Sequence, residues 1–326
     1  MYAWRRYAVV TAGGPKGCLA PKTAADSHAM RLVWAAAAVA LCAGALIGTG
    51  CGSTREVVSL GTVANAAVKT EAVGTARVSL RGSVTFNQDH AQRFEFKGHG
   101  IVDWGTNSAK LRAVYKFPDP IQESIKQEFG RPASADLIVD GRNGIVLYMR
   151  FPFLKKLMPR GKTWMKADIV EMGKAYGLDL DRMKETKQSD PGQMLAYLKS
   201  AVGVRRIGSD LVRREVTTHY STIVNAQTII EQAPRDQQKA MRKFLRMMGI
   251  KTYPVDIWVG RDGVVRKLAI ELEYKQPRGE YVKMKVSEEY YDFGVEANIE
   301  PPSAKRVLDV TPRLSAKGHA PRRLSS

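Results

Sequence analysis

Cysteine is scarce in this chain. Its 326 residues include three cysteines, Cys18, Cys42 and Cys51, and none follows Cys51. No disulfide and no cysteine-based metal site can therefore form within residues 52–326. A small framework held together by disulfides is excluded. The part of the chain after Cys51 is about 275 residues long and must be stabilised by a hydrophobic core, as one large domain or two small ones.

Motifs for catalysis and metal binding are also missing. The chain contains no G-x-S-x-G elbow, no P-loop and no dinucleotide-binding fingerprint. The histidines after Cys51 lack the spacing of metal ligands: His90, His99, His219 and His319. His219 follows two threonines on a predicted strand, and we interpret it as a structural, hydrogen-bonding residue. The sequence predicts no enzyme, no metal and no cofactor; a hydrolase of the cell envelope is a distant alternative.

The longest apolar run falls just short of a membrane span. It extends from Leu32 to Ile47, whereas a span needs roughly 18 apolar residues or more. Arg31 precedes it, and Gly48-Thr49-Gly50 lies immediately before Cys51. This order is typical of the export signal of a bacterial lipoprotein, in which the cysteine thiol receives a diacylglycerol and the signal is cut before it. We predict that residues 1–50 are an upstream extension and signal peptide, and that Cys51 is lipidated.

Lipidation would place the mature protein at the cell membrane, on its extracytoplasmic face. Two acyl chains hold a soluble domain at a membrane, whereas one chain binds only marginally, at about 0.8 kcal/mol per buried CH₂. An uncleaved transmembrane anchor is the alternative. Met30 is preferred over Met1 as the start of translation, because residues 1–29 contain no apolar run of their own.

Acidic residues are too few to balance the basic ones. The chain has 51 Lys and Arg against 32 Asp and Glu, which gives a net charge of +19. Residues 1–50 carry five basic residues and one acidic residue, so removal of the signal lowers the net charge by four, to +15. Such a charge on a tethered domain favours contact with anionic lipid head groups, each Lys or Arg contributing about 1 kcal/mol. A solvated basic surface is the alternative. The predicted compartment argues against nucleic acid as a partner.

One cationic segment, residues 155–162 (KKLMPRGK), is flanked by the large apolar residues Phe151, Phe153 and Trp164. This mixture suits the water side of a membrane interface. A solvated loop with two or three buried anchors explains it equally well.

The remaining boundaries follow from composition. Residues 51–72 are expected to hold the lipidated cysteine, a tether and the start of a first helix. From Ser303 onward the sequence is polar, basic and rich in Pro, Ser and Gly, so we expect disorder there and assign residues 312–326 to a basic disordered tail. The first helix is expected to have one common side, formed by Val63, Ala66, Ala67 and Thr70.

Alternation with a period of two dominates the middle of the chain and predicts strands with one buried face. Asp140–Gly144 is a turn between the apolar runs 137–139 and 145–149, which predicts a hairpin. Short turns between adjacent strands imply an antiparallel sheet. The alternating apolar residues are Val78, Leu80, Val84, Phe86, Phe94, Phe96, Leu111, Ala113, Tyr115 and Phe117. Later strands are predicted over 216–224, 253–259, 265–274 and 281–291, with the GRDG turn at 260–263.

Two helices interrupt the strands. Asp190-Pro191 opens one that Gly203 ends, and Pro234-Arg235-Asp236 opens another that Gly249 ends. Their apolar sides must be covered, and the inner face of the sheet is the only large apolar surface available. The predicted fold is α+β: a curved antiparallel sheet with helices covering its concave face. The apolar stripes are Met194, Leu195, Leu198 and Val202 in the first helix, and Met241, Phe244, Leu245 and Met248 in the second.

Four segments carry a family resemblance through their joint order. They are Val216–Tyr220 (VTTHY), Pro254–Val259 (PVDIWV) with the Asp262-Gly263 turn, Tyr291–Gly294 (YDFG), and Pro301-Pro302 ahead of Asp309. With them, the chain resembles the LolA-like exported lipoproteins over residues 73–311, particularly the actinobacterial relatives of LppX and LprG. The resemblance implies that these residues form a lipid-binding domain. It implies an antiparallel β half-barrel whose concave face is covered by helices, around a hydrophobic pocket that holds acyl chains and carries lipids or lipoproteins across the envelope. An envelope transporter or an acceptor lipoprotein is then a possible partner.

A pocket of this kind needs apolar side chains, because a lipid tail leaves a membrane only where comparable apolar surface receives it. The alternative is an ordinary packed core in a structural or interaction lipoprotein that binds no ligand. The predicted lining residues are Val84, Phe94, Phe96, Leu111, Tyr115, Leu147 and Met149 from the strands, and Leu195, Leu198, Phe244 and Met248 from the helices.

Overall fold

The computed structural model describes most of the chain after residue 60. The described ranges are 61–86, 89–130, 133–142, 144–152, 155, 158–175, 204–232, 235–247, 251–275 and 281–316. The predicted signal peptide, Cys51 and the predicted helix over 190–203 lie outside them. None of the helices in these ranges has the length and hydropathy that a bilayer span requires.

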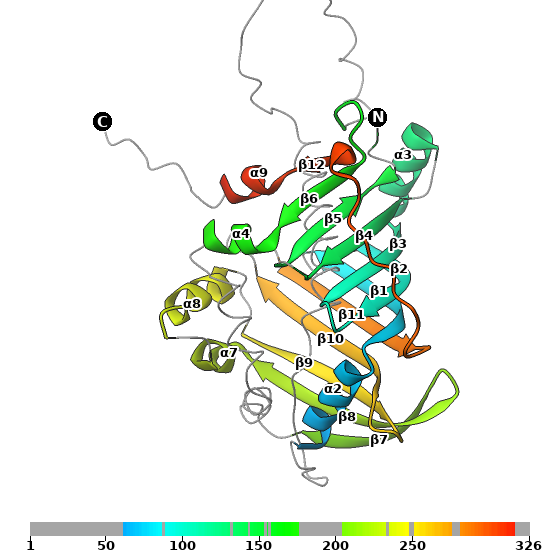
Figure 1. Cartoon of the computed structure of the whole chain (residues 1–326), viewed down its shortest axis with the longest axis vertical. Coiled ribbons are helices and arrows are strands. Elements are labelled where there is room, and N and C mark those ends of the chain that lie inside the picture. Colours follow the sequence, from blue (N-terminus) through cyan, green and yellow to red (C-terminus); the bar gives the residue numbers. More distant parts are fainter. Residues whose placement is uncertain are drawn as a thin grey trace, which may run out of the picture. The chain divides into compact units, whose positions relative to one another are not determined.

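One open, curved sheet of twelve strands organises the described residues (Figure 1). Its spatial order is β12-β6-β5-β4-β3-β2-β1-β11-β10-β9-β8-β7, so β12 and β7 are its edges. Every neighbouring pair is antiparallel except β12 and β6, which run parallel. The predicted α+β fold with an unclosed sheet is confirmed. The strands are β1 (Thr75–Phe86), β2 (Asp89–Asp103), β3 (Ser108–Lys116), β4 (Ser134–Asp140), β5 (Val146–Arg150), β6 (Trp164–Asp168), β7 (Arg205–Val212), β8 (Glu215–Asn225), β9 (Thr252–Gly260), β10 (Val265–Lys275), β11 (Tyr281–Tyr291) and β12 (Val307–Asp309).

The helices are short and lie between or beside strands. Helix α2 contacts β9 and β10, α7 contacts β8 and α8, and α4 and α9 contact each other and β6. The helices in the described ranges are α2 (Gly61–Ala72), α3 (Asp119–Phe129), α4 (Ile169–Ala175), α7 (Ala226–Gln232), α8 (Gln238–Met247) and α9 (Thr311–Ala316), with a 3₁₀ helix at Ala304–Arg306.

Strand β1 shows the predicted alternation. Val78 and Leu80 are buried, whereas Arg77 and Arg81 are exposed. We call the side of the sheet that carries Val78 and Leu80 the apolar face, and the side that carries Arg77 and Arg81 the polar face. Directly opposed residues of paired strands share a face, so the register assigns the residues of neighbouring strands to one face or the other.

Both predicted hairpin turns are confirmed. Around the first turn, β4 and β5 pair with Val139 opposite Leu147. Around the GRDG turn, β9 and β10 pair with Val259 opposite Val265. Strand β11 has the predicted bounds, 281–291.

The predicted first helix is α2, and its buried side is the predicted one. Val63, Ala66, Ala67 and Thr70 are each at most 2% exposed. The Thr70 hydroxyl donates to the Ala66 carbonyl (2.6 Å) and accepts from the amide N–H of Val265 (2.9 Å). These bonds join the helix to the start of β10.

The helix predicted to open at Pro234 begins later. Residues 235–237 form a turn, and the amide N–H of Met241 donates to the Gln237 carbonyl (2.8 Å), so α8 starts at Gln238. Met241 and Leu245 from its predicted stripe are buried. The sequence analysis missed α3, α4, α7, β6 and β7; of these, α4 and α7 have seven residues each and β6 has five.

The disorder expected from Ser303 onward is wrong as far as Ala316. Strand β12 pairs with β6, where the Lys166 ammonium lies 3.2 Å from the Asp309 carboxylate. The amide N–H of Asp168 donates to the Thr311 hydroxyl (2.9 Å) at the start of α9. The strand pairing, this ion pair and this hydrogen bond therefore hold a polar segment in place. Residues 317–326 lie outside the described ranges.

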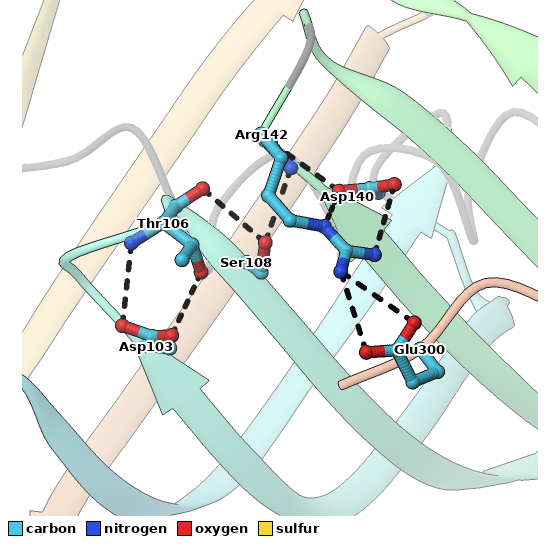
Figure 2. Close-up of polar contacts among 7 residues, drawn as sticks. Asp103, Thr106, Ser108, Asp140, Arg142 and Glu300 are labelled. Atoms are coloured by element: carbon cyan, nitrogen blue, oxygen red, sulfur yellow. Dashed lines mark hydrogen bonds and ion pairs between the residues drawn. The ribbon is translucent and has the colours of Figure 1, made fainter. Parts of the chain in front are cut away.

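The segment before β12 packs on the polar face. Ile299 contacts Ile138 and Trp164 there, and all three are buried. Figure 2 shows Arg142 between two carboxylates, with Nε 2.8 Å from Asp140 and Nη1 3.4 Å from Glu300. The segment before β12 thus covers apolar side chains on the polar face.

Candidate functional site

The seven strand residues predicted to line a pocket lie together on the apolar face. Val84 directly opposes Phe94, and Phe96 directly opposes Tyr115. The register therefore brings these residues together, while their contact with lipid stays a prediction. Each of the seven is at most 6% exposed: Val84, Phe94, Phe96, Leu111, Tyr115, Leu147 and Met149.

Aromatic rings form a run on this face, across β1, β2 and the end of β3. The ring centroids of Phe86 and Phe94 are 6.1 Å apart, and those of Phe94 and Phe117 are 5.7 Å apart. The Tyr115 and Phe117 rings stack at 6.2 Å. These spacings fall in the range of favourable aromatic pairs, about 4.5–7 Å, so the rings form a continuous apolar surface.

The helical half of the predicted lining is largely outside the described residues. Leu195, Leu198 and Met248 lie there, and so does the side chain of Phe244. Of the α8 residues, Met241 and Leu245 are buried in the core. The placement of the four helix residues stays a prediction.

One row of directly opposed residues crosses seven strands of the apolar face. From β8 to β3 this central row comprises Thr222, Val255, Ile270, Val286, Gly82, Phe96 and Tyr115. Both ends are polar: the Thr222 and Tyr115 hydroxyls are buried and have no hydrogen-bond partner among the described residues. Burial raises the pKa of the Tyr115 hydroxyl, which therefore stays protonated.

A carboxyl group lies beside the central row, and the sequence analysis missed it. Glu288 on β11 opposes Leu80 and Leu268 and is 2% exposed. Its Oε2 atom accepts a hydrogen bond from the Tyr290 hydroxyl, whereas its Oε1 atom has no partner within the described ranges. Burial raises the pKa of Glu288 from 4.5 to about 7, and the bond from Tyr290 opposes this rise.

The sequence does carry a signal for this carboxyl group. In the predicted strand over 281–291, alternate residues share a face, so Glu288 is expected on the same face as Val282, Met284 and Val286. An acidic residue at a position where the alternation is apolar is almost never fully buried without a partner. Such a residue is a candidate for function.

On the polar face, His219 is held by hydrogen bonds, as the sequence suggested. Its Nε2 atom lies 3.0 Å from Asp256 Oδ1, and its Nδ1 atom lies 3.3 Å from Asp210 Oδ2. Its ring stacks on Trp258 with centroids 4.2 Å apart. The indole N–H of Trp258 donates to Asp210 (2.7 Å), so this cluster joins β7, β8 and β9. In the described part of the chain, no three His, Cys, Asp or Glu side chains converge to hold a metal ion.

The large residues beside the cationic segment at 155–162 act as buried anchors. Phe151 and Trp164 are buried, and the Arg150 guanidinium lies 5.1 Å from the centroid of the Trp164 ring. These contacts favour the interpretation of a solvated loop over that of a membrane interface; Phe153 lies outside the described residues.

Cations gather on the polar face of β1, β2 and β3. Arg81 opposes Lys97, Lys97 opposes Val114, and Lys116 lies two residues further along β3. These three cations form no ion pair with other described residues, and Val114 is 49% exposed. We call Arg81, Lys97, Val114 and Lys116 the basic patch.

Comparison with known proteins finds relatives in Streptomyces. No protein-family profile matches the chain. An uncharacterised 31.2 kDa protein of Streptomyces griseus is 30% identical over 170 residues, which cover 49% of this chain and 52% of that protein. A putative lipoprotein of Streptomyces coelicolor is 28% identical over 163 residues, which cover 48% of this chain and 46% of that protein. The chain thus spans about half the length of the curated relatives it matches.

Solved structures similar to this one include the group that the sequence motifs resemble. The lipoprotein LppX of Mycobacterium tuberculosis matches with a TM-score of 0.41 at 12% identity, over 74% of this chain and 97% of that one. LprF of Mycobacterium bovis matches with a TM-score of 0.35 at 13% identity, over 75% and 97%. A LolA superfamily protein of Nitrosomonas europaea matches with a TM-score of 0.24 at 8% identity, over 69% and 92%. At such identities, the likeness concerns the fold alone.

Proposed function

We propose that this protein is a lipoprotein of the bacterial cell envelope, tethered through Cys51, whose open sheet receives acyl chains on its apolar face. It carries or presents lipids and performs no chemistry on them. The observation that carries the proposal is the apolar face itself, where the central row and the aromatic run together give apolar side chains from β9 to the end of β3.

The energetics of transfer support this role. Each CH₂ group kept from water stabilises the bound state by about 0.8 kcal/mol, so an acyl chain moves from a membrane to a protein only where the protein is equally apolar. The central row and the aromatic run meet that requirement. Because the protein itself buries these side chains, loading requires that the segments covering them move aside.

The tether and the charge support a position at the membrane. The run of Leu32 to Ile47 followed by small residues and Cys51 has the order of a lipoprotein signal, and one relative carries the name of a putative lipoprotein. The basic patch is then available to anionic head groups. An envelope transporter or an acceptor lipoprotein supplies or receives the lipid.

A structural or interaction lipoprotein of the same fold, with a filled core, is the second candidate. The near-complete burial of Phe96 and Met149, each 1% exposed, favours it. A side chain that lines a permanent cavity keeps a larger accessible surface than these two residues do.

Mass spectrometry of organic extracts distinguishes the two candidates. Wild-type protein purified without added lipid should release about one lipid per chain, and a filled core releases none. Ala113→Phe places a ring on the apolar face, where Ala113 is 1% exposed, and should reduce the amount released. Ile223→Phe on β8 is the control, because Ile223 lies on the polar face and is 45% exposed, and it should leave the amount unchanged. Circular dichroism of each variant checks that the fold is kept.

A further inference from the structure

Glu288 places in the middle of the apolar face one hydrogen-bonding atom, Oε1, that has no partner among the described residues. Its neighbours across the strands are Leu80 and Leu268, which are 1% and 5% exposed, and Val286 on the same strand is 4% exposed. Buried polar atoms in proteins nearly always have a partner in the protein, in water or in a ligand. The Tyr290 hydroxyl satisfies only Oε2, and Oε1 has no partner in the described part of the chain.

We propose that Glu288 binds ligand: its Oε1 atom hydrogen-bonds an uncharged hydroxyl group of a lipid whose hydrocarbon part lies on the apolar face. This inference rests on the proposed function and names its substrate class. The lipids are hydroxyl-bearing and neutral, as distinct from fatty acids or phospholipids.

The chemistry of the carboxyl group selects a hydroxyl. A carboxylate accepts a hydrogen bond, and a protonated carboxyl group both donates and accepts. A ligand hydroxyl group can form a hydrogen bond with either the carboxylate or the protonated carboxyl group, because a hydroxyl is itself a donor and an acceptor. A ligand carboxylate or phosphate would place a second negative charge beside Glu288 in apolar surroundings, where like charges repel strongly. A ligand ammonium would have to be desolvated there.

The hydroxyls of Tyr115 and Thr222 lie too far along the sheet to bind the same group. Each is three strands from β11 in the spatial order, and strands are about 4.8 Å apart, which gives roughly 14 Å along the sheet. Glu288 therefore acts without them.

The test compares two probes that differ in one donor, 1-hexadecanol and hexadecyl methyl ether. Both are titrated into the full chain after removal of endogenous lipid, using wild type, Glu288→Leu and Glu289→Leu. Glu289 is the matched control, because it is the next residue on β11, faces the opposite side of the sheet and pairs with Arg213 (3.1 Å). Wild type and Glu289→Leu should bind the alcohol about tenfold more tightly than the ether, as expected for a hydrogen bond to a charged group. Glu288→Leu should bind both probes with the affinity of the ether.

Equal binding of alcohol and ether by wild type would overturn the inference and leave the proposed function intact, since both probes would still bind. An unchanged preference in Glu288→Leu would overturn it as well. Failure of wild type to bind either probe would refute the proposed function together with the inference. A second measurement covers the case in which Glu288→Leu does not fold: in wild type labelled with ¹³C-glutamate, hexadecanol should shift the Glu288 carboxyl resonance and the ether should not.

Discussion

The phenyl ring of Phe96 occupies the space that a side chain on Gly82 would need. A Cβ atom on Gly82 would lie 2.1 Å from Cζ of Phe96 and 2.6 Å from the carbonyl oxygen of Lys285. The two residues oppose each other on β1 and β2 in the central row. The Phe96 ring can therefore lie against β1 only because position 82 has no side chain.

Gly82→Ala should destabilise the protein by about 1–3 kcal/mol, the usual cost of overpacking a close-packed interior. Either the Phe96 ring or the β11 backbone must move to admit the methyl group. Urea unfolding followed by circular dichroism measures the loss. The control is Gly208→Ala on β7, where a Cβ would meet no atom within 4 Å. Equal stability of the two variants would show that the ring does not fill this space.

The raised pKa of Glu288 makes its contribution to stability depend on pH. The folded protein binds the proton more tightly than the unfolded chain, because the pKa rises from 4.5 to about 7. Wild type should therefore lose stability relative to Glu288→Gln as pH rises from about 4.5 to 7, by about 3 kcal/mol in total, with little change beyond.

Chemical unfolding of both proteins at several pH values checks this prediction. Only the difference between them is informative, because all other titrating groups are shared. Glu289→Gln, on the polar face, should follow wild type across the same window. A constant difference between wild type and Glu288→Gln would mean that Glu288 titrates near its ordinary pKa.

Removal of the charges in the basic patch should weaken binding to anionic vesicles. With Arg81, Lys97 and Lys116 all changed to Gln, the partition coefficient should fall on the order of a hundredfold at low salt. Vesicle co-sedimentation with and without phosphatidylserine measures it. The triple variant Lys239→Gln, Arg242→Gln and Lys243→Gln on α8 loses the same net charge and should retain more binding. Equal losses would show that net charge, and not the patch, governs attachment.

Fatty-acid labelling tests the anchor at Cys51. Cells expressing wild type and fed a radioactive fatty acid should label the protein, and cells expressing Cys51→Ala should not. Cys42→Ala is the matched control, because Cys42 lies within the predicted signal and is lost with it. Labelling of Cys51→Ala at the wild-type level would refute lipidation at this residue.

Most of the sheet could be predicted from alternation, for a physical reason. A strand with one buried face needs apolar residues at every second position, and β1, β3 and β11 show this period almost without interruption. Strand β7 could not be found in this way. It is an edge strand whose residues are mostly exposed, so its sequence has little reason to alternate.

The candidate site was predicted only in part. The alternation identified which strand residues share a face, but it treats each polar residue as an outward one. Glu288 breaks that rule, and its burial depends on contacts with β1 and β10, which are distant in sequence. The order at the C-terminus was missed for a similar reason, because Ile299 is stabilised by Ile138 and Trp164 and not by its own neighbours.

The pairing of β1 with β11 constrains when this protein can fold. Arg77 lies opposite Tyr291 in the centre of the sheet, so strands on the order of 200 residues apart must meet, and contacts of such long range make folding slow. A ribosome has to release nearly the whole chain before the two halves of the sheet can be joined. Until then β1 and β11 each lack one neighbour, and a chain that has not yet joined its two halves is one that can still be threaded through a membrane.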